Sequence, residues 1–72
     1  MKIKINGEGY IHSHEDCTLS HVLMVYLSRE DIEHVRGIAV AINGSLIRKT
    51  NWRNTQVEEG DEIEVLTATQ GG

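Results

Sequence analysis

The chain has 72 residues, a formal net charge of −4 and only seven lysines and arginines against eleven aspartates and glutamates. A single domain of this size buries only about 60% of the surface of its unfolded chain, which leaves little room for an enclosed active site. The negative charge and the absence of a Lys/Arg cluster argue against binding to nucleic acid, because that binding depends on neutralising phosphates.

The composition also bears on cellular location. One cysteine excludes an internal disulfide framework. Residues 1–5 alternate instead of forming the apolar core of a signal peptide, and no apolar run is long enough to span a membrane. We therefore expect a cytoplasmic protein that does not associate with membranes.

The first predicted elements form a hairpin. Residues 2–5 alternate with period two, which is typical of a strand. Residues 6–9 read Asn-Gly-Glu-Gly and tolerate positive φ, so they should turn the chain into a second strand over residues 10–13.

A helix is predicted next, because the apolar period changes at Thr18. Leucine, valine and tyrosine side chains then fall on one helical face, which we interpret as core, at positions 19, 22, 23, 26 and 27. Thr18 suits the N-cap, and the helix should end near Ser28. Ile32 and Val35 can pack a short turn in the connection that follows.

The second half of the chain predicts three strands. Residues 38–42 are apolar on both faces and indicate a buried strand, and Asn-Gly at 43–44 predicts a hairpin into residues 45–48. Trp52 is expected to close one end of the core, with a surface anchor as the alternative. The final strand, 61–66, alternates between apolar and acidic side chains.

Together these elements predict one α+β domain over residues 1–72. A single helix between two hairpins buries its apolar face only by lying across one face of the sheet. The order ββαββ is that of a ubiquitin-like β-grasp, in which the first and last strands usually lie side by side in a mixed sheet. Residues 67–72 should then leave the sheet as a flexible tail.

The tail ends in Gly71 and Gly72 and contains no apolar side chain larger than alanine. Six residues reach about 20 Å, far enough to bring a terminal carboxylate into a cleft on another protein. Glycines suit a narrow channel because they lack Cβ atoms. A frayed terminus is the alternative interpretation.

A dense acidic run precedes this tail. Its members are Glu58, Glu59, Asp61, Glu62 and Glu64. Such a run suits the electrostatic steering of a basic partner surface toward the tail. A solvated strand face is the alternative.

Three histidines and the cysteine form the sharpest competing motif. His12, His14, Cys17 and His21 are residue types that bind zinc. Their spacing fits no standard zinc motif, so we predict no metal site and expect a histidine-bearing, exposed strand face. No basic residue adjoins Cys17 to activate it, and its thiol is interpreted as a spectator. The roles of all four residues are left open.

Three segments carry a resemblance to a known family. They are Ala-Val-Ala-Ile-Asn-Gly at 39–44, Gly-Asp-Glu-Ile-Glu-Val at 60–65 and the pair Gly71-Gly72. In register with one another, they resemble the ThiS sulfur carriers of thiamine biosynthesis over essentially the whole chain. The likeness extends more loosely to ubiquitin and to the small subunit of molybdopterin synthase. The chain departs from many members in lacking proline and in placing Gln70 before the glycine pair.

The resemblance implies a carrier that is a substrate of other enzymes and has no cofactor of its own. A ThiF-like adenylyltransferase using ATP and magnesium would adenylate Gly72, with Gly71 giving access. Sulfur from a cysteine desulfurase would then form a thiocarboxylate, for donation to a ThiG-like thiazole synthase. Gln70 and the acidic run would contribute to partner binding, and the free carrier is expected to be a monomer.

Two other functions remain open at this stage. One is a β-grasp sulfur carrier for another pathway, similar to the small subunit of molybdopterin synthase. The other is a non-catalytic protein-binding module or a ubiquitin-like modifier, in which the surface of the sheet matters more than the tail.

Overall fold

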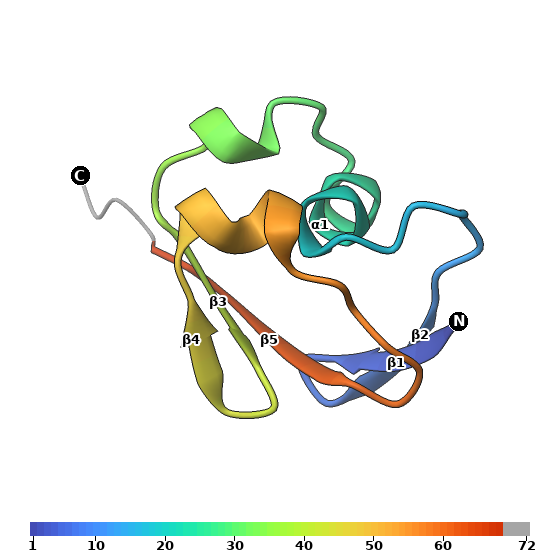
Figure 1. Ribbon diagram of the computed structural model, residues 1–72. Helices are drawn as coiled ribbons and strands as arrows, with labels where there is room; N and C mark the ends of the chain where they lie inside the picture. Colours follow the sequence, from blue (N-terminus) through green and yellow to red (C-terminus); the bar gives the residue numbers. More distant parts are fainter. Residues whose placement is uncertain (69–72) are drawn as a thin grey trace.

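The computed structural model describes residues 1–68 as a sheet with one main helix across one face (Figure 1). The elements in chain order are β1 (Lys2–Ile5), β2 (Glu8–Ile11), α1 (Leu19–Leu27), the 3₁₀ helix η1 (Ile32–His34), β3 (Ile38–Ile42), β4 (Ser45–Ile47), the 3₁₀ helix η2 (Lys49–Asn54) and β5 (Glu62–Thr67). The predicted α+β fold is therefore confirmed, with two strands before the helix and three after it, and two 3₁₀ helices are added in the connections.

The last strand occupies the centre of the sheet. The strand order is β2-β1-β5-β3-β4. β5 runs parallel to β1 and antiparallel to β3, so the first and last strands lie side by side as predicted. Backbone hydrogen bonds on both edges hold β5 in place.

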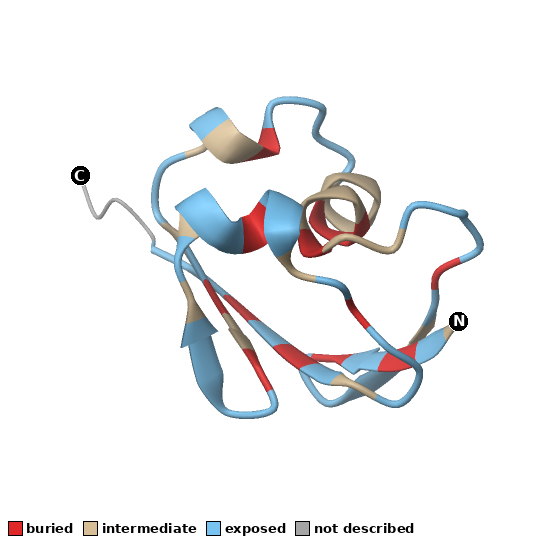
Figure 2. Ribbon diagram, in the orientation of Figure 1, coloured by how far each residue is buried: buried red, intermediate tan, exposed pale blue. Residues whose placement is uncertain are grey.

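Side chains from both layers form the core (Figure 2). Ile63 and Val65 on β5 are buried while Glu62 and Glu64 are exposed, as the alternation predicts. Trp52 is also buried, and its indole N–H donates a hydrogen bond to the carbonyl of Ile47 at 3.0 Å. Trp52 is thus a core residue, and the alternative of a surface anchor is wrong.

The helix begins and ends where the sequence predicts. The Thr18 hydroxyl accepts a hydrogen bond from the backbone N–H of His21 at 3.3 Å, which is an N-cap. Ser28 ends the helix with a φ of 56°, in the left-handed conformation typical of a helix C-terminus. Leu19, Val22 and Leu23 are fully buried. No helix within residues 1–68 has the length and apolar character needed to cross a membrane.

The second strand lies two residues earlier than predicted. Asn6 and Gly7 have φ values of 53° and 82° and form a two-residue turn by themselves, so β2 begins at Glu8 and ends at Ile11. His12 consequently lies beyond the strand and is buried, at 1% exposure. The expected exposed strand face bearing histidines is wrong.

The prediction for β3 is also corrected in part. Val40 and Ile42 are buried in the core, but Ala39 on the opposite face is exposed. The sheet has a second layer on one side only. An apolar residue on the other side of β3 therefore remains in contact with solvent.

Candidate functional site

The base of the C-terminal tail is part of the folded body. Thr67 pairs with Ile38, and the backbone N–H of Ala68 donates to the carbonyl of Gly37 at 2.7 Å. The predicted start of the tail at residue 67 is therefore two residues too early. The predicted sites Gln70, Gly71 and Gly72 lie outside the described residues, and their roles stay predictions.

The backbone conformation at Gly37, and not a lack of space beside it, favours glycine at this position. Its φ of 77° is a backbone conformation that residues with a side chain adopt only with strain. A Cβ atom at this position would lie 3.5 Å from both the Cβ and the carbonyl oxygen of Ala68. A glycine here therefore lets the chain turn into β3 beside the end of β5.

Two asparagines from opposite hairpins hold β5 at its edges. The side chain of Asn6 accepts a hydrogen bond from the N–H of Val65 at 2.8 Å and donates to its carbonyl at 3.2 Å. The side chain of Asn43 accepts from the N–H of Glu62 at 3.0 Å and donates to Asp61 at 3.1 Å. These contacts extend the ladder on both sides of the strand that carries the tail.

An apolar patch lies on the open face of the sheet, beside the end of β5. It consists of Ala39, Ala41, Leu46 and Leu66, and is called the open-face patch below. Leu46 is 73% exposed and Leu66 is 64% exposed. Ala39 pairs with Leu66, and Ala41 pairs with Leu46, so the four side chains are neighbours on three adjacent strands. Large exposed apolar side chains gathered on one face indicate an interaction surface.

Sequence reasoning missed this patch, although part of the signal was present. The alternation that buries Ile63 and Val65 places Leu66 on the outer face with Glu62 and Glu64. Leu46 gives no such signal, because β4 is only three residues long. Its neighbours across the sheet become known only from the strand pairing.

The structure divides the predicted acidic run into two groups. Glu62 and Glu64 are exposed on the open face, next to the open-face patch. Glu59 and Asp61 instead support the turn before β5, where they accept hydrogen bonds from the backbone N–H groups of Lys2 and Glu58. Of these four carboxylates, only Glu62 and Glu64 therefore lie on the open face of β5.

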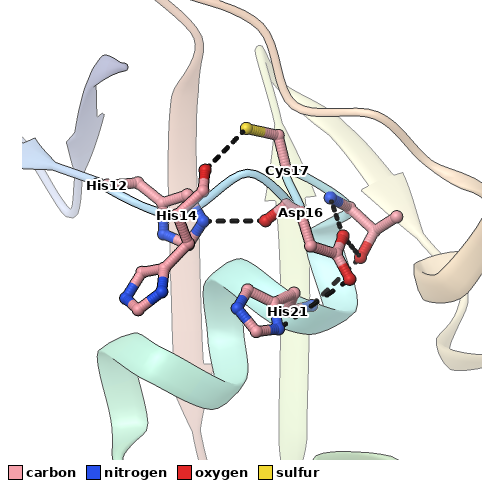
Figure 3. A network of polar contacts seen from close by, with 6 residues as sticks. His12, His14, Asp16, Cys17 and His21 are labelled. Carbon is pink, nitrogen blue, oxygen red and sulfur yellow. Dashed lines mark hydrogen bonds and ion pairs between the residues drawn. The ribbon is translucent and has the colours of Figure 1, made fainter.

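The predicted histidine motif comes together at the start of α1, whereas its cysteine does not join it (Figure 3). The Cys17 thiol faces the carbonyl of His14 at 3.6 Å. Asp16 lies between two of the imidazoles, with its backbone oxygen 2.9 Å from Nε2 of His12 and its carboxylate 3.9 Å from Nδ1 of His21. Hydrogen bonds from the backbone N–H and hydroxyl of Thr18 hold the pKa of the Asp16 carboxyl below its usual value.

Comparison with known families gives a match over almost the entire chain. The sequence model of the ThiS family matches residues 3–72, a range that includes all of the sheet except Lys2 and also includes the glycine pair. The chain has no match among curated proteins.

Solved structures support the same fold. A crystal structure of the thiamine biosynthesis protein ThiS from Geobacter metallireducens is 22% identical, with a TM-score of 0.73 and full coverage of both chains. A solution NMR structure of a thiamine biosynthesis protein from Geobacter metallireducens is 24% identical, with a TM-score of 0.71, and the alignment covers 100% of this chain and 88% of the other. At these identities the likeness confirms the β-grasp fold.

Proposed function

The chain belongs to the ThiS family, and we propose that it is a sulfur carrier, a substrate of partner enzymes rather than an enzyme. The observation that carries this proposal is the extent of the family match, which includes Gly71 and Gly72. These glycines follow a strand that is paired on both edges. A reactive end on a rigid base is what a carrier needs.

The first proposed step is activation of the Gly72 carboxylate. A carboxylate is a poor electrophile, because its leaving group would be an oxide. On a ThiF-like adenylyltransferase, a carboxylate oxygen attacks the α-phosphorus of ATP and pyrophosphate leaves. The product is an acyl adenylate, from which AMP departs readily. Magnesium and ATP belong to the partner enzyme, and we place this reaction in the cytoplasm.

The second proposed step replaces oxygen by sulfur. The terminal sulfur of a persulfide, formed by a cysteine desulfurase, attacks the carbonyl carbon of the acyl adenylate and expels AMP. A second thiol then reduces the resulting acyl disulfide, which releases the thiocarboxylate and leaves a disulfide on the donor. The thiocarboxylate donates its sulfur to a ThiG-like thiazole synthase, and the carboxylate is regenerated.

The position of Ala68 limits the distance between the folded domain and the reactive carboxylate of Gly72. From Ala68, four further residues extend about 14 Å at roughly 3.3–3.6 Å each. Gly71 has no Cβ and suits the narrow entrance of a partner's active site. Gln70 lies on the same path and contributes to partner choice.

The partner's docking surface is proposed to be the open face next to the tail. The open-face patch offers apolar area, and Glu62 and Glu64 add negative charge beside it. An activating enzyme with an apolar surface bordered by basic residues would match both features. Docking there leaves the end of β5 pointing into the partner.

Intact mass spectrometry tests the carrier function directly. The full chain is incubated with ATP, sulfide and a cognate ThiF-like enzyme whose activity is verified by pyrophosphate exchange. We expect a gain of about 16 Da, the exchange of oxygen for sulfur on an activated carboxylate. The matched control is a chain lacking Gly71 and Gly72, which should gain nothing. No gain on the full chain would refute the carrier function and favour a protein-binding module that uses the open-face patch.

A further inference from the structure

The three histidines at the start of α1 pack against one another. His12 follows β2, His14 lies in the next loop and His21 is on the first turns of α1. The ring centroids are 5.0 Å apart for His12 and His14, 5.6 Å for His12 and His21, and 5.3 Å for His14 and His21. Figure 3 shows the three rings next to one another, with Cys17 directed away from them.

These separations are ordinary for packed aromatic rings, and they are also compatible with three imidazoles around one metal ion. For a Zn–N distance of about 2.0–2.1 Å and tetrahedral angles, the centroids of two bound rings lie about 5.2 Å apart. The observed distances fall on both sides of this value. Three histidines with one further position open to water form a common zinc coordination set.

The hydrogen bonding of His12 leaves one ring nitrogen available for a metal. Its Nε2 lies 2.9 Å from the backbone oxygen of Asp16. A carbonyl oxygen only accepts hydrogen bonds, so Nε2 carries the proton and Nδ1 carries a lone pair. The residue is 1% exposed, and within residues 1–68 Nδ1 has no hydrogen-bond partner. A buried acceptor without a partner is unfavourable, and a bound cation would satisfy it.

Asp16 also lies near a second histidine. Its carboxylate lies 3.9 Å from Nδ1 of His21, which leaves Nε2 of that ring free. Histidine ligands commonly direct their second nitrogen to a carboxylate or a backbone carbonyl, and these contacts fix the ring. The carbonyl of Asp16 supplies such a hydrogen bond to His12, whereas its carboxylate lies beyond hydrogen-bond distance from His21, so the ring of His21 can still rotate.

Hydrogen bonds hold the backbone on either side of the loop, at His12 and at Cys17. The N–H of His12 donates to the carbonyl of Met1 at 2.9 Å, and the carbonyl of Cys17 accepts from Val57 at 2.8 Å. His14 is exposed and lies between these anchors. Its side chain can therefore rotate without disturbing the core.

We propose that His12 Nδ1, His14 and His21 Nε2 bind one zinc ion, with water as the fourth ligand. No three His, Cys, Asp or Glu side chains in residues 1–68 are already arranged to hold a metal. Binding therefore requires His14 and His21 to rotate about their side-chain torsions. This proposal replaces the sequence-based expectation of no metal site, and it excludes Cys17 as a ligand.

Zinc titration of the full, untagged chain by isothermal calorimetry tests the site. We expect one zinc ion per chain, and at least about tenfold weaker binding in His14→Ala and in His21→Ala. The matched control is His34→Ala, because this fourth histidine is exposed and lies on η1, outside the cluster. Equal affinity in all three variants, or no binding by the unmodified chain, would overturn the proposal.

Two further measurements separate the site from its alternatives. Because His12 is buried and its removal can unfold the protein, nitrogen NMR of the unmodified chain should show zinc shifting the Nδ1 resonance of His12. Cys17→Ser should keep the affinity for zinc, and a tenfold loss there would instead make the thiol a ligand. The chain lacking Gly71 and Gly72 should bind zinc with the same affinity. The outcome of this test therefore does not depend on the carrier function.

Discussion

The two ends of the molecule in Figure 1 are organised by different kinds of side-chain contact. At the end of β5, the side chain of Asn6 bonds to Val65, 59 positions away in the sequence. In the histidine loop, the side-chain bonds of Asp16 and His12 join residues only two to four positions apart. The base of the tail therefore exists only when the whole sheet has formed, whereas the side-chain network of the histidine loop can change locally.

The largest effect is expected from a cavity beneath β5. Ile63→Ala should lower the free energy of unfolding by about 2–5 kcal/mol, because the side chain is 1% exposed and its removal leaves a void. Urea unfolding measures this change. Leu66→Ala on the outer face of the same strand is the control and should change stability by no more than about 0.5 kcal/mol. Equal losses in both variants would mean that the two faces of β5 do not differ as described.

A smaller loss is expected when the long-range amide contacts are removed. Asn6→Gly keeps the positive φ of the turn but deletes both hydrogen bonds to Val65, and should cost about 1–3 kcal/mol in urea unfolding. Asn6→Asp keeps the acceptor and should lose less. Amide hydrogen exchange at Val65 should quicken in Asn6→Gly, which loses the acceptor, and change less in Asn6→Asp, which keeps it. Unchanged exchange at this amide in Asn6→Gly would show that the Asn6 side chain does not stabilise the end of β5.

A still smaller loss is expected at the histidine end. Thr18→Ala removes the N-cap of α1 and the hydrogen bond from the Thr18 hydroxyl to Asp16, and should cost about 1 kcal/mol. The Thr18 backbone N–H still bonds to Asp16 in this variant, which limits the loss. Thr18→Ser retains the hydroxyl and serves as the control. If Thr18→Ala lowered the free energy of unfolding by more than Ile63→Ala does, the claim that the contacts of Thr18 matter only locally would be wrong.

Reversing the charges on the open face is expected to have the smallest effect on stability. It should clearly lower the rate of adenylation. The double variant Glu62→Lys, Glu64→Lys should stay within about 0.5 kcal/mol of the original, since both side chains are exposed. Its adenylation by the activating enzyme should be slower and less dependent on salt, because steering by these charges is lost. Glu15→Lys with Glu30→Lys, also exposed, makes the same change of charge elsewhere. Equal rates in the two double variants would exclude recognition by Glu62 and Glu64.

The sequence alone determined the elements whose signals are local. The period of 3.6 from Leu19 onward, the cap at Thr18 and the Asn-Gly turns act within a few residues, so they predict α1 and the second hairpin correctly. They also predict the first hairpin, but with its second strand two residues too late. The alternation of the last strand likewise predicts which side of β5 is buried. From these elements the β-grasp order followed, because one helix can cover only one face of the sheet.

Only the tertiary structure decided the features that depend on which strands become neighbours. The pairing of β3 with β4 and β5 gathers Leu46, Leu66 and the two alanines into the open-face patch. The second contact of Asn6, beyond its turn, also requires β5 to lie beside β1. His12 became buried because a turn two residues shorter than expected moved it past the end of β2 and toward α1. Burial and proximity between distant residues arise from the packing of the whole chain, and no local pattern encodes them.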